Sequence, residues 1–506
     1  MASNSQATNI KPASRSYIMA GLMLTMGLAA MDGTIVATAI PSIVHDLGGF
    51  SLFPWVFSVY LLVQAAMVPI YGKLADIYGR KPMLLIGSAI FLLGSMLSGL
   101  SWNMVALIAF RGVQGVGAAA IVPIATTVVG DLFSIEERAK MQGYLASVWG
   151  ISAVIGPAIG GFLVQYASWH WVFYINVPIG IAAMMTIWFF LHEKVAVYRH
   201  TIDYWGSILI MVSMASIILG LLEGGVGWRW LSWLSAATIG GGLVLVGALI
   251  WVEARAREPV IPLWVFGRRV LAIANIGSLI VGVLSMGLSS FLPTFVQGVL
   301  GKTPLVAGFA LATMSIGWPT ASAYSGKLYL KIGFRNTALI GGGLCTVAGI
   351  GFWSLDMQSQ VWLVAAFSLV MGSGLGLLST SLVVAVQSVV GWNRRGVVTG
   401  SNMFTRMLGS TLGVAVFGSI VNANLAAWFR NTPAAIRMQL PKGLNASSMI
   451  GGASTAKVPQ AALHYVQQGL YIGIHRVFLG LLIAAVLVLV VEWAFPSKPA
   501  MLENLP

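Results

Sequence analysis

The stretch GKLADIYGRKP, residues 72–82, separates two long apolar runs, which cover residues 52–74 and 83–101. Within these eleven residues there are two glycines and four charged side chains. Glycine permits tight turns that other residues avoid. A run of about 20 mainly apolar residues is long enough to cross a membrane as an α-helix. The stretch is therefore interpreted as a short polar turn between two membrane-spanning helices.

The same arrangement returns 254 residues later in the chain. There, residues 326–328 repeat the Gly-Lys-Leu of residues 72–74, and Gly333 takes the place of Gly79. Repeated segments of this kind are typical of membrane proteins built from two parallel halves. The sequence therefore predicts two related helical bundles in one chain.

The overall composition indicates a membrane protein. Hydrophobic residues make up 58% of the chain and charged residues 8%, whereas soluble domains average about 25% charged residues. With so few charges, most of the surface must face lipid. Only α-helices and closed β-barrels satisfy all backbone polar groups there. Residues 482–491 are apolar at every position rather than alternating as barrel strands do, so the chain is predicted to be an all-α membrane protein.

Fourteen apolar runs are long enough to span a membrane. They cover residues 17–40, 52–74, 83–101, 104–130, 142–166, 171–191, 204–223, 232–252, 270–299, 305–330, 337–355, 361–390, 398–428 and 470–494. The repeat pairs the first six runs with the last six, which leaves the seventh and eighth as an inserted pair. The predicted organisation is an N-terminal tail (1–16), an N-terminal six-helix bundle (17–200), the inserted pair (201–255), a C-terminal six-helix bundle (256–494) with a long outer loop (429–469), and a C-terminal tail (495–506).

The basic residues orient these helices. Nineteen of the 28 Lys and Arg residues lie in alternate loops on the side of the N-terminus, and six lie on the other side. Because loops rich in Lys and Arg stay in the cytoplasm, both termini are predicted to be cytoplasmic. The net charge of +14 is spread over these loops and does not indicate a nucleic-acid partner. The single cysteine, Cys345, excludes an internal disulfide and a paired-cysteine metal site.

Residues 72–82 also resemble a loop signature of the major facilitator superfamily, a family of membrane transporters. This resemblance implies a fold of two six-helix bundles. It also implies a network of acidic and basic residues that locks one conformation of the transporter. The residues that we assign to this conformational lock are Gly72, Asp76, Gly79, Arg80, Lys81 and Asp131.

Other segments narrow the resemblance. Residues 31–36 are similar to the first-helix motif of the fourteen-span drug:proton antiporters, and residues 169–180 fit the same group, although His170 replaces a more usual arginine. The fifth helix resembles the antiporter motif, with Ser152 where glycine is usual, and close helix packing through small residues is expected there. The residues of this motif are Gly143, Gly156, Pro157, Gly160 and Gly161.

Asp32 is a carboxyl group inside an apolar helix. It lies 15 residues into the first span, roughly 22 Å from the inner face, and Arg111 lies roughly 10 Å from the outer face. A charge at such depth costs about 2.5–3.5 kcal/mol on insertion scales. The two residues are expected to share one cavity at similar depth. Because burial favours a protonated carboxyl, Asp32 is predicted to carry the coupling proton, and the resemblance implies that Arg111 helps to relay it. The alternative is that Asp32 only fixes helix packing.

A substrate cavity is expected near this pair. The candidate lining residues are Met26, Gln114, Glu223, Arg406 and Arg476, of which Glu223 also fits a solvated helix end. The second half contains no deep acid on this reading, because Asp356 and Glu492 fall near span ends. Either its arginines pair with Asp32 across the cavity, or the transported compound carries negative charge.

The resemblance implies a proton-coupled antiporter that exports hydrophobic or amphiphilic compounds (multidrug efflux) by alternating access, without a cofactor. The alternative substrate is a specific anionic or amphipathic metabolite, and a third reading is a receptor that does not transport. The sequence contains no phosphate-binding loop and no nucleophile–base motif, which disfavours an ATP-driven pump and an enzyme. The expected partners are the lipid bilayer, protons and a small amphiphilic substrate, for a monomer in a bacterial cell membrane.

Overall fold

The fold was analysed in a computed structural model. It describes residues 12–47, 53–193, 204–224, 228–256, 259, 263–302, 304–430, 432–433, 436 and 460–496. Most of the predicted tails, 1–16 and 495–506, and most of the predicted outer loop 429–469 lie outside the described residues. The described residues are almost entirely helical, with one isolated bridge between Gly224 and Trp228.

The first half of the chain forms seven helices, of which the sixth is a single turn. These are α1 (Pro12–Leu47), α2 (Phe53–Tyr78), α3 (Arg80–Gly99), α4 (Met104–Leu132), α5 (Ile135–Tyr166), α6 (Trp171–Tyr174) and α7 (Asn176–Phe190). Two longer helices follow at the predicted inserted pair. They are α8 (Tyr204–Glu223) and α10 (Gly241–Glu253), the latter entered through α9 (Trp233–Ser235) and the π-helix Ala236–Gly240.

The second half repeats this plan with longer helices. Its elements are α11 (Trp264–Gly267), α12 (Arg269–Thr294) with the π-helix Phe295–Val299, α13 (Pro304–Trp353), α14 (Val361–Ser388), the 3₁₀ turn Trp392–Arg394, α15 (Arg395–Arg430) and α18 (Gln460–Trp493). The predicted span 171–191 covers both α6 and α7, the span 232–252 covers α9, the π-helix and α10, and the spans 305–330 and 337–355 share α13. The last helix begins at Gln460 rather than at residue 470.

The repeated glycines form the same turn in both halves. Gly79 has a φ of 97° and separates α2 from α3, and Gly333 has a φ of 86° and divides α13 into two helical segments. A positive φ of this size is readily adopted only by glycine. The sequence repeat at residues 72–82 is therefore also a repeat of backbone geometry.

Local capping explains why α5 begins earlier than the apolar pattern predicts. The Ser134 side chain accepts a hydrogen bond from the Glu137 backbone, and the Glu137 carboxylate accepts one from the Ser134 backbone. This capping box satisfies N–H groups that the first turn would otherwise leave free. The helix therefore starts at Ile135, seven residues before the predicted span.

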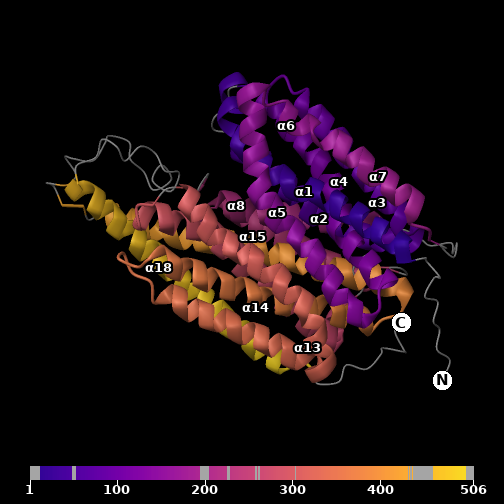
Figure 1. The fold of residues 1–506 in the computed structure, drawn as a ribbon. Coiled ribbons are helices and arrows are strands. Elements are labelled where there is room, and N and C mark those ends of the chain that lie inside the picture. The colour runs from indigo at the N-terminus through magenta and orange to yellow at the C-terminus, as the bar shows by residue number, and fades with distance from the viewer. Residues whose placement is uncertain are drawn as a thin grey trace.

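Among the described residues, 11 helices are long and apolar enough to cross a membrane, with α13 counted once despite its break at Gly333. The total of fourteen crossings, the cytoplasmic termini and the exact domain boundaries stay predictions. Figure 1 shows helices α1–α7 gathered in one bundle and the helices of the second half in another. We call the end of the molecule at which α1 begins and α18 ends the terminal end.

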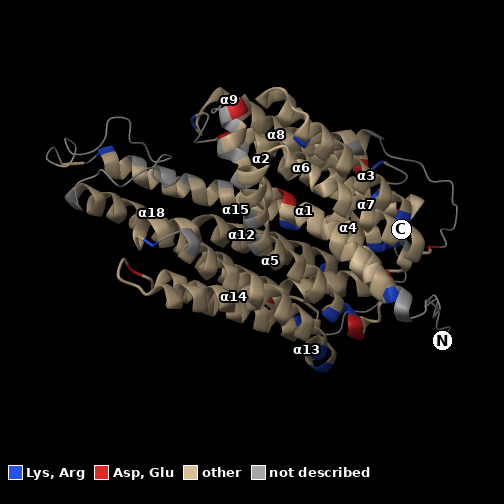
Figure 2. Ribbon diagram, turned by 45° about the horizontal axis from the view of Figure 1, so that its top comes forward, with Lys and Arg blue, Asp and Glu red and all other residues tan. Residues whose placement is uncertain are grey.

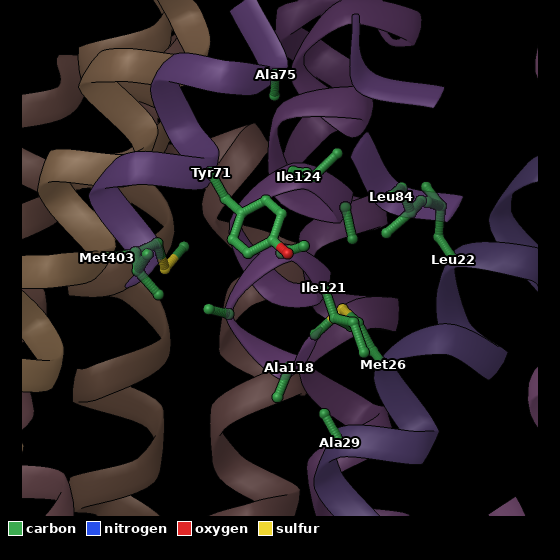
Figure 3. Packing of buried hydrophobic residues seen from close by; sticks show 14 of the residues in the cluster. Leu22, Met26, Ala29, Tyr71, Ala75, Leu84, Ala118, Ile121, Ile124 and Met403 are labelled. Carbon is green, nitrogen blue, oxygen red and sulfur yellow. The ribbon is translucent and has the colours of Figure 1, made fainter. Parts of the chain in front are cut away.

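The core of the first bundle continues into the second half. Leu22 and Met26 on α1 pack with Ile121 on α4, and Met403 on α15 lies beside Tyr71 on α2 within the same cluster (Figure 3). The two halves are therefore joined by apolar packing as well as by polar contacts.

Helices α3 and α4 approach each other closely through glycines. A Cβ added at Gly117 would collide with the backbone of Phe91, and one at Gly94 would lie 2.5 Å from the backbone nitrogen of Gln114. Small residues at such contacts let helix backbones meet in a membrane. This packing fixes the height of Gln114 relative to α3.

We expect Gly117→Ala to destabilise the protein by about 1–3 kcal/mol, as overpacking of a tight core does. The matched control is Gly112→Ala on the same helix, because a Cβ at Gly112 meets nothing within 4 Å. The measurement is the melting temperature of both purified variants in detergent. Equal melting temperatures for the two variants would contradict the packing described here.

Candidate functional site

The candidate site is a set of polar side chains inside the first bundle. We call Asp32, Arg111, Gln114 and Asn176 the Asp32 cluster, and they come from α1, α4 and α7. All four are buried, with Asp32 only 1% exposed and Arg111 fully buried. Most of the helix length carries no charge (Figure 2), so a charged cluster at this position stands apart from its surroundings.

The Asp32 carboxylate is held by donors on both oxygens. The guanidinium of Arg111 forms a direct ion pair with Oδ2. The Gln114 side-chain amide donates to Oδ1 at 2.7 Å, and the Asn176 amide approaches the same oxygen at 3.5 Å. Side-chain donors from α4 and α7 thus surround both oxygens of the Asp32 carboxyl group.

Helix α2 fixes the position of Arg111. Its Nε donates to the carbonyl of Val56 at 3.1 Å, and its Cζ lies 4.3 Å from the ring centroid of Tyr60. Helices α2 and α4 come this close because Gly115 has no side chain; a Cβ there would lie 2.7 Å from the Tyr60 carbonyl oxygen. The guanidinium is thus held against an aromatic face and a carbonyl in addition to its acid.

A second layer of hydrogen bonds orients Gln114 and Asn176. The side-chain oxygen of Gln114 accepts a hydrogen bond from Arg111 at 2.8 Å, so the side-chain nitrogen of Gln114 must face Asp32. Asn176 also donates to Ser95 at 3.0 Å, and Ser95 donates to the Phe173 carbonyl at 2.8 Å. The cluster is therefore a connected network rather than one isolated ion pair.

The expected meeting of Asp32 and Arg111 is found, and Gln114 joins them. Sequence reasoning missed Asn176, Ser95 and Tyr60 as members of the site. An asparagine inside the apolar sixth run, residues 171–191, was the available signal for Asn176. Nothing in the sequence distinguished Tyr60 from other tyrosines near a membrane interface.

Two of the candidate cavity residues lie elsewhere. Met26 is only 3% exposed and packs in the core of the first bundle, because it shares a helix face with Leu22. Arg476 is exposed on the outer face of α18. That face continues through the exposed apolar side chains Leu479, Ile483, Leu487 and Val490, which is the pattern of a lipid-facing stripe. Neither residue lines the predicted cavity.

The other two do not reach the Asp32 cluster either. Glu223 ends α8, on the inserted pair. Arg406 donates to the sulfur of Met403 at 2.9 Å, and among the described residues it forms no ion pair. The predicted pairing of the second-half arginines with Asp32 is therefore not found, because Arg111 holds that carboxylate instead.

The predicted lock residues form a second cluster where the two halves meet. We call Asp76, Arg80, Asp131 and Arg395 the lock cluster. Arg80 contacts Asp76 at 2.7 Å and Asp131 at 3.1 Å, and Arg395 from the second half contacts Asp131 at 2.9 Å. Arg80 also donates to the Trp392 carbonyl at 2.8 Å, and its Cζ lies 4.0 Å from the Trp392 ring centroid.

Asp76 binds the start of a helix in the opposite half. Its carboxylate accepts from the backbone nitrogens of Gly396 at 3.0 Å and Val397 at 2.7 Å, in the first turn of α15. An acid at this place stabilises the helix through free N–H groups and the helix dipole. Gly72 permits the approach, since a Cβ there would lie 2.9 Å from the Gly396 carbonyl oxygen.

Lys81 and Gly79 serve the lock indirectly. Lys81 donates from its backbone to Glu193 at 3.0 Å and from its side chain to the Trp188 carbonyl at 2.6 Å. These contacts tie α3 to the end of α7 within one half. Lys81 therefore does not bridge the halves, and Gly79 supplies the turn that places Arg80.

The antiporter-motif glycines divide between two contacts. A Cβ at Gly143 would lie 2.9 Å from the Pro319 carbonyl on α13, and a Cβ at Gly156 would collide with Thr34 on α1. Gly160 is buried. At Gly161 a Cβ would meet nothing within 4 Å, so no close contact requires a glycine there. Ser152 is buried, and its carbonyl accepts from the Thr34 side chain at 3.1 Å. Pro157 follows Gly156 directly on α5.

Comparison with known proteins agrees with this architecture. A sequence profile of the Major Facilitator Superfamily matches residues 22–203 and 202–414. The chain is 37% identical to Multidrug resistance protein 3 of Bacillus subtilis over 498 residues, or 95% of each chain. It is 36% identical to the multidrug transporter protein MdtP of the same organism over 416 residues, which cover 82% of this chain and 76% of that one.

Solved structures share the fold at low sequence identity. A bacterial homologue of the iron transporter ferroportin, in its outward-facing state, superposes with a TM-score of 0.64 at 12% identity and covers 96% of this chain and 100% of that one. The proton:xylose symporter XylE superposes with a TM-score of 0.61 at 14% identity and covers 97% and 98%. The chain therefore belongs to the Major Facilitator Superfamily, as a multi-pass transporter of the cell membrane rather than an enzyme.

Proposed function

We propose that this transporter exports hydrophobic or amphiphilic compounds in exchange for protons, with Asp32 as the coupling carboxyl. Two relatives that are 36–37% identical over most of the chain are named for multidrug transport or resistance. The observation that carries the proton-coupling part is the fully buried ion pair of Asp32 with Arg111. No cofactor is needed, because the proton gradient supplies the free energy.

The ion pair gives protonation a structural consequence. When Asp32 accepts a proton it loses its charge, and Arg111 is left as an unbalanced cation in a buried site. Breaking a buried pair in this way costs about 3–5 kcal/mol. That free energy is large enough to change the packing of α1 against α4. Proton binding at Asp32 therefore favours a different arrangement of the first bundle.

Alternating access follows if the two halves rock about this site. The lock cluster and the contact of Tyr329 with the Ile135 carbonyl join the halves near the terminal end. With cytoplasmic termini, this arrangement is closed to the cytoplasm. Transport then requires that the lock cluster separates in each cycle. The protein is proposed to work as a monomer, since each chain holds both halves.

The alternative substrate is a specific anionic or amphipathic metabolite. Arg406 favours it, because this cation lies within a membrane helix and forms no ion pair among the described residues. An anionic headgroup would balance that charge. The two proposals share the proton-coupling step and differ in the charge of the transported compound.

We expect Asp32→Asn to abolish proton-driven transport in reconstituted vesicles, because the amide cannot exchange a proton. The assay imposes a pH gradient and follows uptake of the lipophilic cation tetraphenylphosphonium and of the amphiphilic anion taurocholate. The matched control is Asp46→Asn, which removes another acid of α1 that binds Trp169 at 2.9 Å. Proton-driven transport by Asp32→Asn would contradict the coupling proposal. If the wild type transports taurocholate and not tetraphenylphosphonium, the alternative of an anionic substrate is favoured.

We expect Asp76→Asn to open the terminal end more often, because it weakens the hold on the first turn of α15. Gln387 reports this opening, since its side chain is fully buried and donates to the Thr126 carbonyl of the other half at 3.3 Å. With the buried Cys345 changed to Ala, a cysteine introduced by Gln387→Cys should react with maleimide severalfold faster in Asp76→Asn. The control is the exposed acid Glu136, as Glu136→Gln. Equal rates in all three proteins would contradict the lock.

A further inference from the structure

Glu492 is a buried acid in the half opposite Asp32. It is the penultimate residue of α18, and its side chain is fully buried. Neither carboxyl oxygen has a hydrogen-bond partner among the described residues. The sequence predicts a place near a span end, which its position in α18 matches. The neighbouring helices nevertheless cover this end of α18 and bury the carboxyl group.

The space for the carboxyl group is made by a glycine. A Cβ added at Gly277 on α12 would collide with Glu492 Oε1, and it would also lie 2.9 Å from Leu382 on α14. Leu382 belongs to an apolar cluster with Ala274 and Phe495. Glu492 therefore occupies a notch in α12 with apolar side chains around it.

No cation in the described part of the chain forms an ion pair with Glu492, and α14 carries no charged residue. The cations on the helices that pack against α18 are Arg269 on α12, Lys327, Lys331 and Arg335 on α13, and Arg395, Arg406 and Arg430 on α15. Three of these cations have other contacts. Arg269 donates to the Ala494 carbonyl at 3.1 Å, the Cζ of Arg335 lies 5.7 Å from the Trp493 ring centroid, and Arg395 pairs with Asp131.

An ionised carboxylate without partners in such a place is strongly unfavourable, and the group takes up a proton instead. Asp32 and Glu492 therefore differ in the same conformation: the Asp32 carboxyl group is surrounded by donors, whereas the Glu492 carboxyl group has none among the described residues. Ionising Glu492 requires that its O–H bond breaks and that the proton passes to water. Water must then reach the notch.

The cover over Glu492 is linked to the lock cluster. Val397 donates from its backbone to Asp76 of the other half at 2.7 Å. Its side chain belongs to the same apolar cluster as Leu382 and Phe495. A movement of α15 that releases Asp76 therefore also disturbs the apolar cover of Glu492.

We propose that Glu492 is a second proton-binding site, whose proton stabilises the conformation closed at the terminal end and is released when that end opens. The inference rests on alternating access in the proposed function, but not on the role of Asp32. Linkage fixes the sign. The closed form binds this proton more tightly than the open form does, so raising the pH favours opening and lowering it favours closure.

Infrared spectroscopy of the purified protein tests the proton directly. At neutral pH we expect a carbonyl band of a protonated carboxyl group that disappears in Glu492→Gln and persists in Glu136→Gln. A spectrum of Glu492→Gln identical to that of the wild type would overturn the proposal. Retention of a single sharp elution peak by the variant shows that it is folded, and Glu492→Asp, which keeps the carboxyl, should retain a band.

The conformational part is tested by maleimide labelling of Gln387→Cys in the Cys345→Ala background. We expect the labelling rate to rise severalfold between pH 6 and pH 8, beyond the intrinsic change in thiol reactivity measured on a denatured sample. In Glu492→Gln that extra pH dependence should vanish. In Asp32→Asn it should persist. Loss of the pH dependence in Asp32→Asn but not in Glu492→Gln would overturn this inference while leaving the proton coupling of Asp32 intact.

Discussion

The structure of the first bundle depends on one buried ion pair. Asp32 and Arg111 lie on different helices and are almost fully buried, and each charge would be strongly unfavourable without the other. Close packing of the surrounding helices places Gln114 and Tyr60 beside this pair. Gly94 lets α3 meet α4 at Gln114, and Gly115 lets α2 bring Tyr60 against the guanidinium. The contacts of the ion pair with Gln114 and Tyr60 therefore depend on glycine at these two positions.

A second constraint acts where the halves meet. Asp76 on α2 accepts from the first turn of α15, and Asp131 on α4 binds Arg395. Arg80 and Asp76 are almost fully buried while the halves are in contact, and separation of the halves would return these charges to water, which offsets part of the lost ion-pair energy. The Asp32 pair is held deep inside one half, whereas the lock cluster spans two.

The features that could be predicted from the sequence are those that are rare in an apolar chain. In an apolar chain every deep charge stands out, so Asp32 and Arg111 could be paired by depth alone, and the repeated glycine at residues 79 and 333 marked the repeated turn. Which face of a helix is buried was harder to predict. Met26 lies in the core and Arg476 faces outward, because the apolar pattern of a membrane helix does not distinguish lipid from protein.

Partners from distant helices were also beyond prediction. Asn176 and Tyr60 join the Asp32 cluster through tertiary packing, which no local pattern encodes. Glu492 lies near a span end as predicted, but only the packing of α12 and α14 shows that it is covered there. The fold could thus be predicted from composition and repeats, whereas the site required the contacts.

The most direct test of the account measures protons released by the purified protein in weakly buffered detergent solution at pH 7. Tetraphenylphosphonium, or the substrate found in the vesicle assay, is added to wild type and to Asp32→Asn. The account predicts that substrate binding displaces protons from the wild type and that the part due to Asp32 is missing in the variant. Equal proton release by the two proteins, at equal substrate binding, would contradict it.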